Sequence, residues 1–346
     1  MEMTERAMRF GLSGCSGGLE SAPPANLLAL AEQAEAWGFA SLWLNEEHFQ
    51  TPAAGDGRLC FSPVILATAL AARTTRIRVG FSVLLLPLHH PLRLAEEIAT
   101  LDVLSGGRVD FGISRGGNGR YFAAYGLDPE QRTAHFRDTL AFILRCWTDE
   151  TVTVGDGDER YAVQPKPIQR PHPPVYIGGY SDDSIQWAAQ TGHSLILHGI
   201  QSVASLRRCL DIFHAAGGDV GQVPTGRFVY VGESDEVARR EAWPTVVALT
   251  TRLKRIGISR SGLVMAEQDL EPERFFREMA IIGGPETVTA RIGELRDTLG
   301  VRYLNLLPAF FGYLPEALLE HSLALFSEAV MPQFRGQETE RPITVR

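Results

Sequence analysis

The sequence has few cysteines and no clusters of basic residues. Its 4 cysteines lie far apart without a CxxC pair, which argues against a disulfide framework or a zinc site and fits a reducing compartment. The net charge is −8 and neither lysine nor arginine forms runs, so we expect neither a nucleic-acid partner nor a membrane surface. No apolar run reaches membrane-spanning length, and MEMTERAMRF lacks the apolar core of a signal peptide. We therefore expect a cytoplasmic protein that binds small molecules.

Fingerprints for nucleotide binding are also missing. The segment GCSGGLESAPP (14–24) follows the first apolar run and has glycines but no G-x-G-x-x-G pattern, and no Walker A sequence occurs. An open doubly wound sheet usually carries such a phosphate-binding turn after its first strand. The absence of this turn favours a different arrangement of strands and helices.

Short apolar runs alternate along the chain with segments of helical spacing. Each connection between parallel strands needs a crossover, usually a helix, so this alternation predicts a parallel sheet. Eight such units predict a closed (β/α)₈ TIM barrel, and the open doubly wound sheet is the alternative. The expected strands are Met8–Ser13, Ser41–Asn45, Ile77–Leu85, Val109–Ser114, Val175–Gly178, Ser194–His198, Gly226–Val231 and Tyr303–Leu307.

We expect a single domain over residues 1–346. Residues 148–174 are polar and rich in proline, and they read as an insertion between a helix and the fifth strand. Residues 258–286 form a second insertion, between the seventh and eighth strands, which we expect to act as a mobile lid. We expect residues 333–346 to form a frayed tail.

The stretch VDFGISRGGNGRY (109–121) places an arginine and three glycines directly after a predicted strand. In a TIM barrel the active site lies at the carboxyl ends of the strands, so Ser114 and Arg115 are expected on that face. An arginine beside accessible backbone amides suits a phosphate or a carboxylate. The alternative is a surface arginine in a flexible loop.

The stretch GGYSDDS (178–184) joins a predicted strand to a predicted helix. Backbone amides at a helix N-terminus, together with the hydroxyls of Ser181 and Ser184, can bind an anion. Ser181 equally suits an ordinary N-cap, and Asp182 and Asp183 would repel a phosphate unless they point away.

The second strand runs into SLWLNEEHFQ (41–50), which brings Glu46, Glu47 and His48 to the same barrel face. A carboxylate and an imidazole there can share proton-transfer work, and a salt-bridged rim is the alternative. Two histidines in LLLPLHHP (84–91) offer too few ligands for a metal site.

Over most of its length the sequence resembles the bacterial luciferase family of flavin-dependent monooxygenases, especially its α subunit. The resemblance rests on WLNEEHF, on residues 67–116 ending in LDVLSGGRVDFGISRG, on VYIGGYSDDSIQWAAQTG and on GGPETVTARIGELRDTLGVRYLNLL. It implies a (β/α)₈ barrel that binds FMN, reduced by a separate reductase, and that uses O₂ to oxygenate a small or medium organic substrate.

The same resemblance implies roles for particular residues. Arg115, the Tyr180 amide, Ser181 and Ser184 would hold the FMN phosphate. A non-proline cis peptide would lie beneath the flavin ring at Ser82–Val83. Homodimers are common among such barrels, and one is implied here.

Two positions depart from the luciferase pattern. Glu47 stands where the catalytic histidine is expected, followed by His48, so light emission is not implied and Glu47 or His48 is the expected acid or base. Ser114 replaces a reactive cysteine and can still hydrogen-bond near the flavin. Two further functions stay open, a deazaflavin-dependent oxidoreductase of the same superfamily and a non-catalytic flavin-binding subunit.

Overall fold

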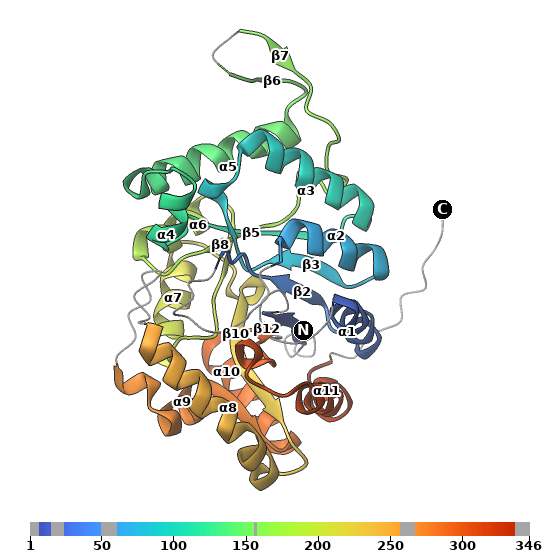
Figure 1. Ribbon diagram of the computed structural model, residues 1–346, viewed down its shortest axis with the longest axis vertical. Coiled ribbons are helices and arrows are strands. Elements are labelled where there is room, and N and C mark those ends of the chain that lie inside the picture. The colour runs from blue at the N-terminus through green and yellow to red at the C-terminus, as the bar shows by residue number, and fades with distance from the viewer. Residues whose placement is uncertain (1–6, 15–23, 50–60, 156–157, 257–266, 336–346) are drawn as a thin grey trace.

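The computed structural model describes residues 7–14, 24–49, 61–155, 158–256 and 267–335. Its main sheet is parallel, and helices surround it (Figure 1). The strands that build the barrel wall are β1 (Arg9–Ser13), β2 (Ser41–Leu44), β3 (Arg78–Phe81) continued by β4 (Leu84–Leu85), β5 (Val109–Ser114), β8 (Val175–Gly178), β9 (Ser194–Ile196), β10 (Pro224–Val231) and β12 (Tyr303–Leu306).

The barrel closes where β12 joins β1 to β10 and where the end of β9 meets β10. β12 pairs with both β1 and β10, and Leu197, just after β9, forms a parallel bridge with Thr225 of β10. The Leu197 amide donates to the Pro224 carbonyl at 3.0 Å, and the Gly226 amide donates to the Leu197 carbonyl at 2.7 Å. The expected TIM barrel is therefore confirmed, and all eight predicted strands are present.

One strand escaped the sequence analysis. The second half of β10 leaves β12 and pairs in parallel with β11 (Ala280–Gly283), which lies within the segment expected to be a mobile lid. Phe275, Met279 and all of β11 are buried in the main core. The lid expectation is therefore wrong for residues 272–283, while residues 257–266 lie outside the described part of the chain. Four residues between two helices carry too little periodicity to reveal a strand.

The outer layer is made of helices that follow the strands in turn. They are α1 (Pro24–Trp37), α2 (Pro63–Arg73), α3 (Pro91–Ser105), α4 (Gly119–Ala124), α5 (Arg132–Thr148), α6 (Asp182–Gln190), α7 (Val203–Ala215), α8 (Asp235–Ile256), α9 (Pro272–Glu278), α10 (Pro285–Leu299) and α11 (Glu316–Leu325). Proline at the first position starts α2, α3, α9 and α10, where its missing N–H leaves no helical bond unmade.

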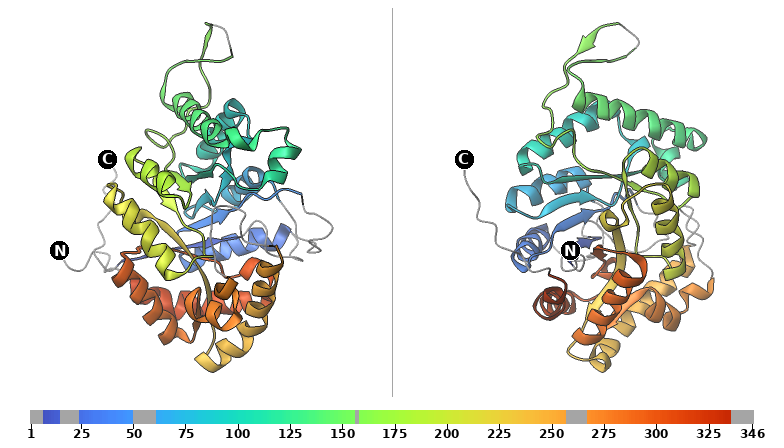
Figure 2. Two further views of the ribbon diagram at one scale, coloured as in Figure 1. Left: turned by 90° about the vertical axis from the view of Figure 1, so that its left-hand side faces the viewer. Right: turned by 180° about the vertical axis from the view of Figure 1, so that it is seen from behind.

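A small antiparallel hairpin stands apart from the barrel. β6 (Val152–Thr153) pairs with β7 (Arg160–Tyr161), and the pair projects from the body in Figures 1 and 2. The chain returns toward β8 along α3, where buried Asp102 accepts hydrogen bonds from the backbone amides of Ile168 and Gln169.

Inside the barrel, the indole of Trp43 is fully buried and packs with Tyr176, Ile196 and Tyr303. Trp43 Nε1 donates to Ser41 Oγ at 2.7 Å, and Ser41 Oγ shares a hydrogen bond with Tyr303 Oη at 2.5 Å. A Cβ on Gly80 would lie 2.6 Å from the Trp43 ring, so only glycine fits beside it. This packed floor leaves the strand ends as the part of the barrel that is open to a ligand.

The third barrel strand contains an irregularity at its upper end. Its pairing with β5 joins Gly80 to Asp110 and next Leu84 to Ile113, so one extra residue stands on the β3–β4 side. The peptide bond Ser82–Val83, within this interval, is cis, as expected from the sequence. Both residues are partly exposed.

Candidate active site

The carboxyl ends of β4, β5 and β8 meet at the mouth of the barrel. A Cβ on Gly178 would lie 3.0 Å from Val83 Cγ1 and 3.5 Å from Ser114 Cβ, so Gly178 leaves space between these two side chains. Ser114 Oγ accepts a hydrogen bond from the Gly116 amide at 3.2 Å. The cis peptide and the SRGG turn are therefore neighbours, as a shared ligand site requires.

Arg115 lies in a cluster of positive charge. Its guanidinium is partly buried and donates to Thr133 Oγ1 at 3.2 Å. Burial lowers the pKa of Arg115, and the charges of Arg132 and Arg137 lower it further, while Asp183 opposes them. Within the described residues Arg115 has no carboxylate at ion-pair distance. Such a cluster is stabilised by an anion.

The N-terminus of α6 lies beside this cluster. Ser181 is its N-cap and accepts from the Ser184 amide at 3.4 Å, and the two hydroxyls lie 2.8 Å apart. Asp182 pairs with Arg208 of α7, which neutralises one of the two acids that would repel an anion. The sequence left open where these acids point, and the structure shows one of them engaged elsewhere.

The loop after β2 holds Glu46, which the sequence analysis placed on this barrel face but did not choose as the acid or base. Glu46 is buried and lies 3.3 Å from His48 Nε2 and 2.9 Å from His89 Nε2, and it accepts from the Leu85 amide at 2.5 Å. Burial by itself would raise the pKa of Glu46, but the hydrogen bonds from His48, His89 and the amide outweigh burial and lower it to about 2. Glu46 is therefore ionised.

The two residues selected from sequence do not pair with each other. Glu47 is exposed and accepts from Tyr121 Oη at 2.7 Å, whereas His48 Nδ1 shares a hydrogen bond with Tyr125 Oη at 3.0 Å. The acid next to the His48 imidazole is thus Glu46, two residues before it. The i, i+2 alternation of an extended chain could have indicated this pairing.

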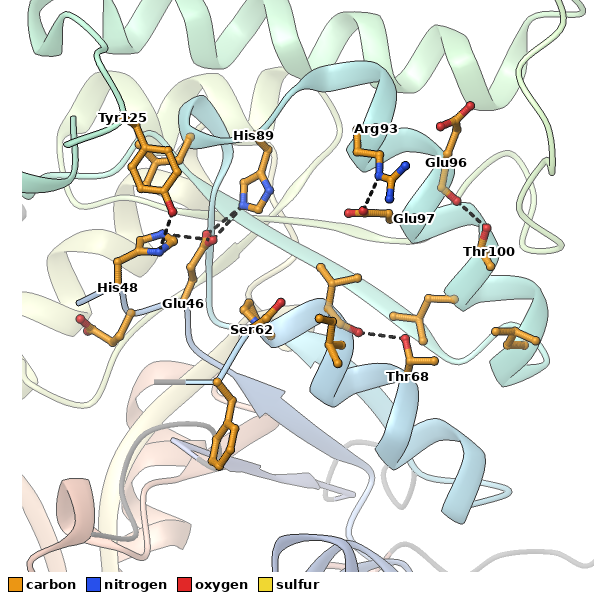
Figure 3. A pocket seen from close by; sticks show the side chains of 18 of the residues that line it. Glu46, His48, Ser62, Thr68, His89, Arg93, Glu96, Glu97, Thr100 and Tyr125 are labelled. Atoms are coloured by element: carbon orange, nitrogen blue, oxygen red, sulfur yellow. Dashed lines mark hydrogen bonds and ion pairs between the residues drawn. The ribbon is translucent and has the colours of Figure 1, made fainter. Parts of the chain in front are cut away.

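A cavity of about 810 Å³ opens beside this group, between α2 and α3. Figure 3 shows Glu46, His48, His89 and Tyr125 together at one end, and Arg93 and other α3 side chains along the remainder. None of the residues of the Arg115 cluster or the cis peptide lines this cavity. This cavity is therefore lined by the carboxylate–histidine group and not by the positive cluster, while Glu47 also reaches Tyr121 of α4, the helix that follows the Arg115 turn.

Replacing Glu46 with Gln is expected to change how stability depends on pH. The pKa of Glu46 in the fold, about 2, is below its ordinary value of 4.5. The carboxylate therefore stabilises the fold fully above pH 4.5, and this contribution is lost as the pH falls toward 2. Urea unfolding between pH 3 and 7 should show a deficit for Glu46→Gln that shrinks toward low pH.

The matched control for this experiment is Glu97→Gln, which removes a carboxylate from an i, i+4 pair with exposed Arg93 on α3. Its effect should stay below about 0.5 kcal/mol throughout. A deficit for Glu46→Gln that is constant with pH would contradict the assigned pKa.

Within the ranges that the structure describes, no three His, Cys, Asp or Glu side chains come together as metal ligands. No helix in the described residues is both long and apolar enough to cross a membrane.

The fold and site define a TIM barrel with a positively charged cluster at its mouth and a carboxylate–histidine group on the loop after β2. Residues 8–302 match the family model of luciferase-like monooxygenases. The chain belongs to the luciferase-like monooxygenase family, and it is an enzyme of that oxidoreductase class.

Three curated relatives illustrate the match. An uncharacterized protein of Sinorhizobium fredii, y4wF, is 30% identical over 316 residues, 88% of this chain and 90% of its own length. Limonene 1,2-monooxygenase of Rhodococcus erythropolis is 27% identical, with 89% and 81% covered. The oxygenase component of a flavin-dependent trigonelline monooxygenase of Acinetobacter baylyi is 26% identical, with 48% and 46% covered.

Solved structures show the same fold. Monooxygenase RslO1 of Streptomyces bottropensis superposes with a TM-score of 0.78 at 25% identity, covering 94% of this chain and 100% of its own. The oxygenating constituent of 3,6-diketocamphane monooxygenase of Pseudomonas putida, in complex with FMN, gives 0.79 at 21%, covering 95% and 99%. An F420-dependent secondary alcohol dehydrogenase gives 0.73 at 17%, covering 95% and 99%.

Proposed function

We propose that this chain is the oxygenase of a two-component FMN-dependent monooxygenase, which receives reduced FMN from a separate reductase and oxygenates a small or medium organic substrate with O₂. The observation that supports FMN is the Arg115 cluster, where three arginines face one acid beside the N-terminus of α6. A terminal phosphate is the anion that such a cluster and a helix N-terminus fit best. The name of the trigonelline oxygenase component is consistent with a two-component system.

The residues around the barrel mouth would divide the work of holding FMN. Arg115, Ser181, Ser184 and the Tyr180 amide would bind the phosphate, and the Ser82–Val83 peptide would support the ring, with Ser114 beside it. When bound, FMN supplies the electron-transfer chemistry with O₂, and the protein supplies orientation and a dry surrounding.

His48 and Glu47 are the proposed acid–base residues. Glu46 lies 3.3 Å from the buried His48 Nε2 and so favours a proton on that atom, which leaves Nδ1, beside Tyr125 Oη, as the ring nitrogen that can take up or release a proton. Tyr121 orients Glu47, whose exposed carboxylate is accessible from solvent. Tyr121 is itself buried and helps to exclude water from the loop after β2.

We also propose a single barrel domain and a homodimer. Ile65 on α2 and Leu104 on α3 line the 810 Å³ cavity and are 74% and 64% exposed, which is unusual for large apolar side chains on the same groove. Sedimentation velocity at micromolar concentration measures the oligomeric state directly.

The proposed function is tested by anaerobic titration with photoreduced FMN, followed by mixing with O₂. We expect saturable binding of reduced FMN at micromolar concentrations and uptake of O₂ that rises when a substrate is oxygenated. Binding of reduced deazaflavin coenzyme with no binding of FMN would replace the proposal with the hydride-transferring alternative. Binding of FMN with no oxygenated product from any organic compound in a broad panel would indicate the non-catalytic subunit.

A further inference from the structure

His198 lies at the barrel mouth and has no role in the site described so far. Leu197 still pairs with β10, so the extended chain of β9 continues to His198. Alternation places His198 on the same side as Ile196, whose side chain packs inside the barrel with Trp43 and against Val83. His198 therefore lies one layer above this interior group, on the level of the strand ends.

The hydrogen bonding of the ring defines where its proton lies. The Ile200 amide donates to His198 Nδ1 at 3.3 Å, so Nδ1 is an acceptor and the neutral ring carries its proton on Nε2. Burial lowers the pKa of His198 to about 4, which keeps the ring neutral at physiological pH. Within the described part of the chain, no hydrogen bond is made by His198 Nε2. This atom is also not one of the buried side-chain atoms that lack a partner, so it is accessible to a ligand. The ring thus presents an unused N–H donor, and the residue is partly exposed.

The orientation of this donor is held from two sides. Phe311 stacks on the imidazole with ring centroids 5.5 Å apart and planes at 25°, and the Tyr180 hydroxyl accepts from the His198 amide at 3.2 Å. Phe311 has φ of 56° and the preceding Phe310 has φ of 48°, a left-handed conformation that residues other than glycine adopt only with backbone strain. Backbone strain of this kind concentrates at ligand sites.

Tyr180 connects this group to the proposed phosphate site. Its amide precedes the Ser181 N-cap, while its hydroxyl contacts the His198 backbone. A molecule that places an anion at Ser181 and extends over the barrel mouth would therefore pass the β9 end. The neutral N–H of His198, flanked by the Phe311 ring, suits an uncharged hydrogen-bond acceptor. A second anionic group of the ligand would instead need a positively charged side chain at this position.

We propose that His198 Nε2–H donates a hydrogen bond to a carbonyl oxygen of the molecule bound over the barrel mouth, with Phe311 holding the ring in place. The carbonyl belongs either to the pyrimidine ring of the flavin or to the organic substrate. This inference rests on the proposed function for the location of the ligand, but it concerns a different residue and a different contact.

The test uses two variants of the full chain. His198→Phe keeps a ring that can stack on Phe311 and removes the donor, and His198→Gln retains an N–H donor. We expect His198→Phe to weaken the binding of the carbonyl compound about tenfold and His198→Gln to restore most of the loss. Nitrogen NMR of histidine-labelled wild-type protein without ligand should show the proton on Nε2.

Two titrations distinguish the sources of the carbonyl. FMN alone is the first probe, and its weaker binding to His198→Phe, with a shift of its visible absorbance, assigns the contact to the flavin. Cyclohexanone and decanal, added to the FMN-loaded protein, are the second probes, and a loss confined to them assigns the contact to the substrate. The proposal is overturned if FMN binds to His198→Phe as it binds to wild type and neither carbonyl probe binds more weakly to the variant. Failure of both carbonyl probes to bind to wild type counts as no loss. If wild-type protein binds no flavin, the proposed function fails instead, and the test of His198 is then the titration of the flavin-free protein and its His198→Phe variant with cyclohexanone and decanal, together with the NMR measurement.

Discussion

Replacing Arg115 with Ala is expected to weaken the binding of reduced FMN about 100-fold, equivalent to about 2.7 kcal/mol. The physical reason is that the variant removes a partly buried guanidinium that lies near the like charges of Arg132 and Arg137 and is opposed by Asp183. Hydrogen bonds to charged groups contribute about 1.5–3 kcal/mol each, so loss of one bidentate contact accounts for the effect. Fluorescence or absorbance titration under anaerobic conditions measures it.

Riboflavin provides the sharpest comparison because it has the same ring and no phosphate. The Arg115→Ala variant should bind riboflavin as the wild type does, so that the selectivity for FMN over riboflavin falls by the same factor of about 100. The matched control is Arg120→Ala, because Arg120 is exposed on α4 only five positions away and should leave both affinities unchanged. Equal weakening of FMN and riboflavin binding would show that Arg115 does not contact the phosphate.

Replacing Gly112 with Ala is expected to produce the largest loss of stability of any glycine substitution in the barrel wall. A Cβ on Gly112 would overlap the carbonyl oxygen of Phe81, a backbone atom that cannot rotate away as a side chain would. Overpacking of a core commonly costs about 1–3 kcal/mol, and a fixed backbone neighbour places this variant at about 3 kcal/mol or more. Urea unfolding, monitored by far-ultraviolet circular dichroism, gives the difference in unfolding free energy.

Gly293→Ala is the control for this experiment. Gly293 lies within α10, and a Cβ there would meet nothing within 4 Å. Because alanine favours a helix more than glycine does, this variant should be more stable by about 0.5–1 kcal/mol. A Gly112→Ala variant as stable as wild type would mean that β3 and β5 do not approach each other as closely as described.

Much of the candidate site could be predicted because its residues follow strands directly. Arg115 comes one residue after β5, and Ser181 caps the helix that follows β8, so the barrel rule alone brings them to the same face. The cis bond at Ser82–Val83 was expected through the family resemblance and is present. In both cases the information lies within a short stretch of chain.

The rest depended on pairs of residues that are distant in sequence. Glu46 obtains its hydrogen bond from His89 across the next barrel strand, and Asp182 is neutralised by Arg208 from another helix. The segment before α10 carries a strand that only its pairing with β10 reveals. Side-chain alternation suggests which residues share a face, but it does not say which of them meet.

The sequence by itself determined the barrel and the face on which its candidate site is expected, because strand and helix periodicities are local and parallel strands must end together. Tertiary structure alone decided which acid accompanies His48, which way Asp182 turns, and that the imidazole of His198 carries its proton on Nε2. Those outcomes depend on burial and on hydrogen bonds between segments, and both arise only when the chain has closed into its barrel.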